Sequence, residues 1–424
     1  MADRSTVFER VLIGKETTPG TAVSPSRALS SMSFSPSYQV DVQTFKPKGY
    51  KFNTVAVLNR EWTEGGIEGM AAYDELPYLL ASLIKDVSPT TPGGATNARL
   101  WTFSATTSDS DTPATYTVET GSSIRSMKCP YVLVTEGGFA YSNSEGVQVS
   151  GAFIGQMTTD DKTRYIKVTS ASGGTFTITV GAQTTGAIAY NAATAAVLAA
   201  LEALSNVAPG DVTVGGAVGN YVVLFTDTGV FGNTAVPVVS VNGASLTGSG
   251  AAVAVTRIAP GYTESDLVPV ARPQTQFTIA DAAADLGSSD TVLTRLLSAN
   301  WNLSGRWGPI WTINSDVRSW AAALETDPEG TLEWTVGADD QGMDFLNTLR
   351  KGDTIFFRAA SVGPLIEAGY NYEFTVDTAV KITEIGELSD EDGLVAIPYT
   401  GTFVHDATWG KAFQITVQNA LTAL

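Results

Sequence analysis

The C-terminal stretch NYEFTVDTAVKITEIGELSDEDGLVAIPYTGTFVHDATWGKAFQITVQN, residues 371–419, is a succession of short β patterns. In its last segment Phe413, Ile415 and Val417 alternate with polar residues, which is the period of a half-buried strand. The segments 371–377, 379–385 and 394–404 have a similar character and are separated by turn residues. We therefore expect a mainly β fold, built as an antiparallel β-sandwich or barrel-like domain.

Outward from this stretch, strand-like patterns also cover 99–157 and 353–359, and helical patterns are few. The clearest helix is AYDELPYLLASLIKD, 72–86, whose leucines fall on one face and for which Asp74 is the expected N-cap. Weaker helical patterns occur at 290–298, 315–324 and 340–350. The sequence thus predicts a β domain flanked by a helix.

Residues 160–260 differ in composition from the rest of the chain. They contain five acidic and four basic residues and are rich in Ala, Thr, Val and Gly. An alternating strand around Phe176 is followed by the helical segment AATAAVLAALEALS and by further strands. We predict a small inserted α+β domain here, with 1–158 and 261–424 forming one discontinuous body.

The charge and cysteine content limit the classes of function. The 424 residues carry a formal net charge of −18, the wrong sign for a protein that grips nucleic acid. The single cysteine, Cys129, excludes an intramolecular disulfide and suits folding in a reducing cytosol. We recognise neither an export signal nor a membrane span in the sequence.

Candidate catalytic and ligand-binding residues are sparse. The single histidine, His405, follows a predicted strand, where a surface or turn position is expected, and Cys129 is expected to be buried. The acidic run 387–393 lacks the spacing of a calcium loop and is interpreted as a hairpin turn. Trp301, Trp307 and Trp311 are either a sugar platform or, more commonly, packing residues. We therefore expect no enzyme and no catalytic, metal or cofactor site.

Several segments, in this order, resemble the tail tube (major tail) proteins of long-tailed bacteriophages. They are VLIGKETTPGTAV at 11–23, the loop-and-strand region 45–69 followed by DELPYLLASL at 74–83, and the C-terminal stretch 371–419. Within the insert, 174–214 resembles a module found inserted in phage structural proteins. The resemblance covers the two flanks, about three-quarters of the chain, and the length and insertion favour a non-contractile tail.

The resemblance implies a structural protein of the virion tail, made in the host bacterial cytoplasm. Six subunits would form a ring, rings would stack head to tail, and an acidic-lined channel would let double-stranded DNA pass without specific binding. The partners implied are further copies of the chain, the tape measure protein, the tail terminator and the distal tail or baseplate proteins. The insert would face outward, away from the channel.

The same resemblance suggests which residues take part in assembly. It implies a mobile stacking loop at 41–66. The apolar candidates for stacking or subunit contact are Val11, Ile13, Phe45, Tyr50, Phe52 and Trp62. The candidates for the channel wall are Glu61, Glu64, Glu68, Glu384 and Glu387, for each of which an ordinary solvated face is the alternative. The competing functions are a virion decoration or adhesin-type binding module and, with less support, a hydrolase.

Overall fold

The computed structural model describes residues 9–122, 126–156, 159–160, 162–226, 236–259, 262–313, 319–391 and 393–424. Strands predominate in these residues, and three α-helices occur among them. The strand pairs are antiparallel except for the short pair β2 (Arg27–Leu29) and β19 (Thr263–Glu264). The predicted mainly β, antiparallel fold is therefore confirmed.

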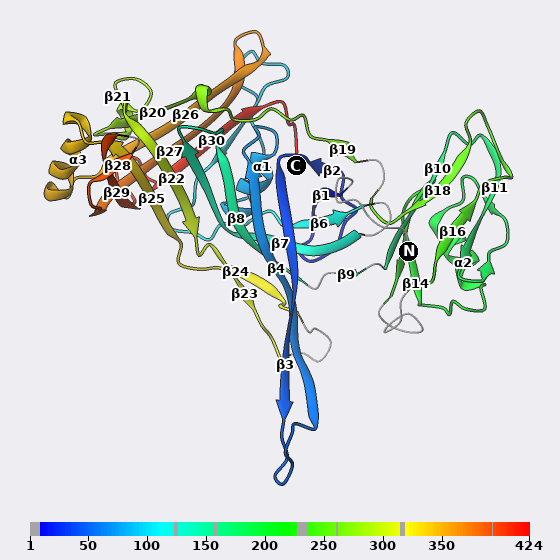
Figure 1. The fold of residues 1–424 in the computed structure, drawn as a ribbon. Coiled ribbons are helices and arrows are strands. Elements are labelled where there is room, and N and C mark those ends of the chain that lie inside the picture. The colour runs from blue at the N-terminus through cyan, green and yellow to red at the C-terminus, as the bar shows by residue number, and fades with distance from the viewer. Residues whose placement is uncertain are drawn as a thin grey trace.

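One layer of the main body is a long antiparallel sheet, which we call the front sheet (Figure 1). β27 (Tyr370–Ile385) extends it through its C-terminal part, which pairs with β29. The other strands, in spatial order, are β3 (Met32–Phe45), β4 (Val55–Met70), β8 (Gln148–Gly155), β7 (Ser126–Ser142), β22 (Leu296–Ser304), β25 (Glu329–Gly337) and β29 (Leu394–Phe403).

A second layer, the back sheet, covers the inner side of the front sheet. β27 belongs to both layers, because its N-terminal part pairs with β26 and β30 while its C-terminal part pairs with β29. The remaining strands of this layer are β20 (Thr275–Ala280), β21 (Thr291–Val292), β26 (Ile355–Glu367), β30 (Phe413–Asn419) and β5 (Arg99–Phe103). The short β28 (Ser389–Glu391) pairs with β29.

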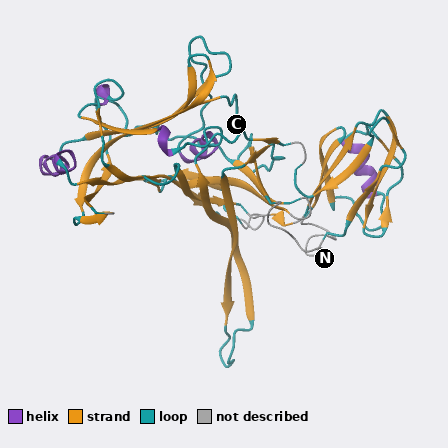
Figure 2. Cartoon of the chain, turned by 45° about the horizontal axis from the view of Figure 1, so that its top comes forward, coloured by secondary structure: helices purple, strands orange, loops and turns teal. Residues whose placement is uncertain are grey.

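The core between the layers is aromatic. Trp301 of β22 is 1% exposed and packs against Phe139 of the front sheet and Phe413 of the back sheet. Its indole Nε1 donates to the Thr378 hydroxyl at 3.0 Å, so its one polar group is satisfied. α1 (Leu76–Leu83) is buried along its whole length and contacts β7 and β5, one strand of each layer. Figure 2 shows this helix between the two sheets.

Two helices differ in how they begin. α3 (Asp340–Lys351) is capped by Asp339, whose carboxylate accepts from the Gly342 N–H at 2.9 Å, and it ends at Gly352 with a φ of 71°. α1 begins without a side-chain cap, so the expected capping role of Asp74 is wrong. The neighbouring Glu75 instead accepts from the backbone N–H groups of Ser30 and Ser31.

A smaller sheet joins the main body to the insert. β1 (Arg10–Lys15) lies between β2 and β6 (Tyr116–Gly121), and β6 pairs with the first half of β7. β9 (Thr159–Asp160) pairs with the same part of β7. This arrangement places the start of the insert beside β7 and its end beside β2.

Residues 162–259 have a hydrophobic core of their own, centred on Phe176, Ile178, Val197 and Tyr221. Figure 1 shows them at one side of the molecule, away from the front sheet. Their elements are β10 (Thr163–Thr169), β11 (Gly173–Val180), β12 (Gln183–Thr184), β13 (Ile188–Ala189), α2 (Thr194–Glu202), β14 (Val212–Ala217), β15 (Asn220–Phe225), β16 (Val239–Asn242), β17 (Leu246–Thr247) and β18 (Ala252–Thr256).

Two predicted helices, at 290–298 and 315–324, differ from the structure in the described residues. The segment 290–298 forms β21 and the start of β22, because pairing with β20 and β25 outweighs a weak helical pattern. Of the predicted helix at 315–324, residues 315–318 lie outside the described part, and the end joins β24 (Ala322–Glu325), which pairs with β23 (Trp307–Ile310). Short 3₁₀ turns occur at Arg272–Gln274 and Ala283–Asp285.

Candidate assembly surfaces

The hairpin of β3 and β4 extends far beyond the rest of the front sheet (Figure 1). Near the body, Met32, Phe34 and Ile67 are buried in the main core. Beyond Thr63, β4 pairs only with β3, and we call residues 38–62 the arm. The predicted loop at 41–66 is therefore mostly paired strand, with only 46–54 outside the strands, and its mobility stays a prediction.

The arm exposes an unusual number of large apolar side chains. An isolated two-stranded hairpin is only marginally stable, and exposed apolar patches of this kind mark interaction surfaces. Of the predicted contact residues, Phe45, Tyr50 and Phe52 are 46%, 60% and 78% exposed. The exposed apolar residues of the arm are Tyr38, Val40, Val42, Phe45, Tyr50, Phe52, Val55 and Val57.

The tip of the arm, residues 45–54, is also basic. It contains Lys46, Lys48 and Lys51 and no acidic residue, in a chain whose net charge is −18. All three lysines are exposed, interleaved with Tyr50 and Phe52. The tip is thus a local positive and aromatic surface on an acidic molecule.

Trp62, another predicted contact residue, already has partners within the chain. Its ring meets the edge of Trp311 at 5.6 Å between centroids, and the Arg60 guanidinium lies 4.8 Å from the Trp311 ring centre. Trp62 is half-buried by this contact with the segment that follows β23. This contact orders the base of the arm, and a role of Trp62 in contact with another subunit stays a prediction.

The other two contact candidates, Val11 and Ile13, both lie in β1. β1 pairs on one side with β2 and on the other with β6, so it is not a free arm. Ile13 is 1% exposed and belongs to the main core, which excludes it from a surface contact. Val11 is half-buried and packs against the same core.

The outer face of the front sheet is open and polar. Strand register aligns its side chains in rows, since residues paired across antiparallel strands point to the same face. One row reads Glu68, Ser150, Gly138, Asn302, Thr331, Thr402 and Lys381. The next row reads Met70, Gln148, Ala140, Asn300, Glu333, Thr400 and Glu384. We call this surface the front face.

The structure brings two of the predicted channel-wall residues together on this face and adds one. Glu68 lies on β4 and Glu384 on β27, near opposite edges of the sheet, and both are exposed. Glu333, which the sequence analysis did not select, is exposed between them. The alternation of Glu333 with the buried Leu332 and Trp334 was the signal that could have identified it.

The other three acidic candidates have different positions. The side chain of Glu61 points to the opposite face of the sheet from those of Glu64 and Glu68, because successive residues of β4 face opposite sides. It is 8% exposed and accepts a hydrogen bond from the Tyr38 hydroxyl at 2.7 Å, so its assignment to an open wall is wrong. Glu64 is exposed near the arm and accepts from Trp62, and Glu387 is exposed in the link between β27 and β28.

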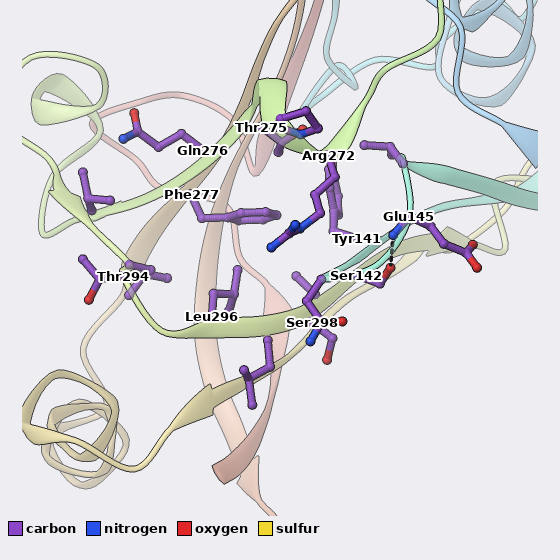
Figure 3. Close-up of a pocket in the computed structure, with 17 residues that line it drawn as sticks. Tyr141, Ser142, Glu145, Arg272, Thr275, Gln276, Phe277, Thr294, Leu296 and Ser298 are labelled. Atoms are coloured by element: carbon purple, nitrogen blue, oxygen red, sulfur yellow. Dashed lines mark hydrogen bonds between the residues drawn. The ribbon is translucent and has the colours of Figure 1, made fainter. Parts of the chain in front are cut away.

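A cleft opens at the end of the front sheet opposite the arm (Figure 3). Its volume is about 510 Å³, and it lies between the turn after β7, the start of β20 and the start of β22. The rings of Tyr141 and Phe277 meet edge to face at 4.9 Å on one wall. Figure 3 shows the Arg272 guanidinium pointing into the cleft, beside Phe277 and above Leu296 and Ser298.

Two neighbouring hollows continue this cleft along the sheet edge. They share Ser142 and Ser298 with it, and they add Glu391 and Glu333 to its acidic rim residue Glu145. All three carboxylates belong to exposed residues. The rim is therefore acidic, with one arginine at its centre.

The residues with candidate chemistry are dispersed. Cys129 is buried, with its Sγ 3.4 Å from the Gln156 carbonyl oxygen, and His405 is exposed just after β29. Trp301 and Trp307 are 1% and 6% exposed, so the tryptophans do not form an open platform. In the described residues no group of three or more His, Cys, Asp or Glu side chains could hold a metal ion.

Two buried carboxyl groups, Asp74 and Glu119, have raised pKa values. Burial raises the pKa of Asp74 to about 6, although Arg27 acts in the opposite direction. Asp74 is 3% exposed. Burial also raises the pKa of Glu119, which accepts from the Tyr165 hydroxyl at 3.0 Å and the Ala259 N–H at 3.3 Å and so links the insert to β6.

Known proteins give no direct guide to these surfaces: no protein-family model and no curated protein sequence matches the chain. Every helix in the described ranges is too short or too polar to cross a membrane.

Proposed function

We propose that this protein is a self-assembling structural subunit, the tube protein of a long-tailed and non-contractile bacteriophage tail. Copies form rings of six that stack head to tail around a channel. The observation that carries the proposal is the arm, a long hairpin with exposed apolar residues on strands that continue into the core of the body. Such a segment gains its missing contacts in an assembly, where a neighbouring copy covers it.

The front face supports the channel part of the proposal. Apart from Met70 and a single basic residue, Lys381, its rows consist of Ser, Thr, Asn, Gln, Gly and Ala with Glu68, Glu333 and Glu384 among them. Small neutral side chains carry no positive charge that could bind DNA phosphates, and carboxylates repel the phosphates. A sheet face of this kind suits a wall along which double-stranded DNA moves without specific binding.

The remaining parts of the proposal follow from this arrangement. The insert lies to the side of the front sheet (Figure 1), which suits an outward position in a tube. The subunit would be made in the cytoplasm of the host bacterium and would act in the virion. Its partners would be further copies, the tape measure protein, the tail terminator and the distal tail or baseplate proteins.

Shortening the arm tests the proposal directly. Gln43 pairs with Val57 and Val42 with Leu58, so residues 43–57 can be replaced by Asn-Gly, which closes a two-residue hairpin. We expect folded subunits that form no tubes in negative-stain electron microscopy at a concentration where the parent protein does. Tubes of unchanged length from the shortened protein would contradict the proposal.

The front face gives a second test. In assembled tubes of the double variant Glu68→Lys/Glu384→Lys, we expect retention of short duplex DNA that falls steeply with added salt, whereas parent tubes retain little. A matched variant with lysines at the exposed Asp266 and Asp281, outside this face, carries the same charge change and should behave like the parent. Equal retention by both variants would remove the front face from the channel wall.

A decoration or adhesin-type binding module is the alternative, and the exposed apolar arm also suits binding to a foreign surface. The two functions differ in what the parent protein does alone. Concentration-dependent tubes support the tube protein. A closed small oligomer that binds purified capsids or glycans and never elongates would support the alternative.

A further inference from the structure

We propose that the tip of the arm docks in the Arg272 cleft of a second copy of this chain. This inference rests on the proposed head-to-tail assembly and names its two contacting surfaces. The tip is residues 45–54, and the seat is the cleft around Arg272, Tyr141 and Phe277 with its acidic rim.

The first argument is position. β4 runs from Val55 beside the tip to Met70, which pairs with Gln148 just after the turn that lines the cleft. Tip and cleft therefore lie at opposite ends of the same sheet, about 50 Å apart at the usual rise of a strand. The tip of one copy reaches the cleft of the next when copies are related by translation along the strands. Such a contact is heterologous and does not close on itself, so it propagates.

The second argument is charge. The tip carries Lys46, Lys48 and Lys51 without an acid, and the seat carries Glu145, Glu333 and Glu391 around its rim. Opposite charges on the two surfaces orient the approach and disfavour the contact of a tip with a tip or a rim with a rim. The chain as a whole is acidic, so the basic tip is a specific feature of this surface.

The third argument is the shape and chemistry of the cleft. Its volume of about 510 Å³ falls in the range of sites that hold compact apolar groups. Tyr50 and Phe52 are exposed at the tip and offer aromatic rings for it. An inserted ring meets Phe277 and Leu296 on the apolar side and stacks on the Arg272 guanidinium, which favours aromatic faces. Arg272 therefore does not exclude the basic tip from the cleft, because the tip would place an aromatic ring, and not a lysine, against the guanidinium.

A disulfide test measures the contact itself. In the variant Tyr50→Cys/Asn143→Cys, one new cysteine is on the tip and the other is on the turn beside the cleft. The native Cys129 is buried, which keeps the background low. We expect mild oxidation of assembled tubes to give a ladder of linked chains on non-reducing gels. The matched control Tyr50→Cys/Ser150→Cys, with its second cysteine on the front face, should give no ladder.

A charge-exchange test measures its energetics. Lys48→Glu/Lys51→Glu at the tip and Glu145→Lys/Glu391→Lys at the seat should each raise the critical concentration for tube formation by about tenfold or more. The protein with all four substitutions should return to within about threefold of the parent, because each reversed tip meets a reversed seat. Lys162→Glu/Lys167→Glu on the insert makes the same charge change as the tip variant and should leave the critical concentration unchanged.

The outcomes separate this inference from the proposed function. Tubes that give no tip-to-cleft ladder and no rescue overturn the seat while leaving the tube protein in place. A parent protein that forms no tubes under any condition overturns the proposed function and the seat together. Tubes with both the ladder and the rescue support both.

Discussion

The two halves of the β3–β4 hairpin differ in surroundings although they belong to the same two strands. Near the body, Phe34 packs against Phe153 with ring centres 5.4 Å apart and is 7% exposed. In the arm, Phe45 is 46% exposed and has only the hairpin beside it. Phe34 therefore stabilises the folded subunit. Phe45 buries its ring fully only when another surface covers the arm. The difference separates residues of the fold from residues of the assembly.

The largest expected effect comes from Phe34→Ala. Removing a buried ring leaves a cavity, and we expect the free energy of unfolding to fall by about 3–5 kcal/mol. Denaturant unfolding followed by tryptophan fluorescence measures it. A loss below about 1 kcal/mol would mean that the hairpin's inner half is not part of the cooperative core.

The next effect concerns Asp74, which is buried in the body close to the start of α1. Its folded-state pKa of about 6 lies above the unfolded value, so the carboxyl group stabilises the fold at low pH and that contribution is lost as pH rises towards and through 6. Between pH 4 and pH 7 the parent should lose about 2 kcal/mol from this group. Asp74→Asn should remove this part of the pH dependence in denaturant titrations at several pH values. An unchanged pH profile would contradict the assignment.

A smaller effect is expected where the arm begins. Tyr38→Phe removes the hydroxyl that donates to the buried carboxylate of Glu61. We expect a loss of about 1 kcal/mol, because a hydrogen bond to a buried group is removed while the aromatic ring stays. Thermal or denaturant unfolding measures it. A stability equal to that of the parent would show that the Tyr38–Glu61 pair does not order the base of the arm.

The smallest effect on stability comes from Phe45→Ala in the arm. An exposed substitution should change the free energy of unfolding by no more than about 0.5 kcal/mol. Its effect should appear instead in a higher critical concentration for tube formation, measured by light scattering. A large loss of folding stability together with unchanged assembly would reverse the comparison between the two halves of the hairpin.

The sequence by itself determined the class of fold and much of its local structure. Strict alternation at Phe413, Ile415 and Val417 correctly predicted β30, and leucine spacing correctly predicted α1. These predictions succeed because side-chain direction follows from local backbone geometry, with a period of two in a strand and 3.6 in a helix. The same alternation distinguishes Glu68 from Glu61 once the buried side of β4 is known.

Only the tertiary structure decided which apolar and acidic residues remain exposed. Val11-Leu12-Ile13 and the apolar residues of the arm look alike as sequences, yet β1 is covered by β2 and β6 whereas the arm has no third strand. The weak helical pattern at 290–298 gave way to pairing with β20 and β25, and the Arg272 cleft brings together segments from 141 to 299. Burial depends on packing against segments that are distant in sequence, and a local sequence pattern does not specify which segment packs against it.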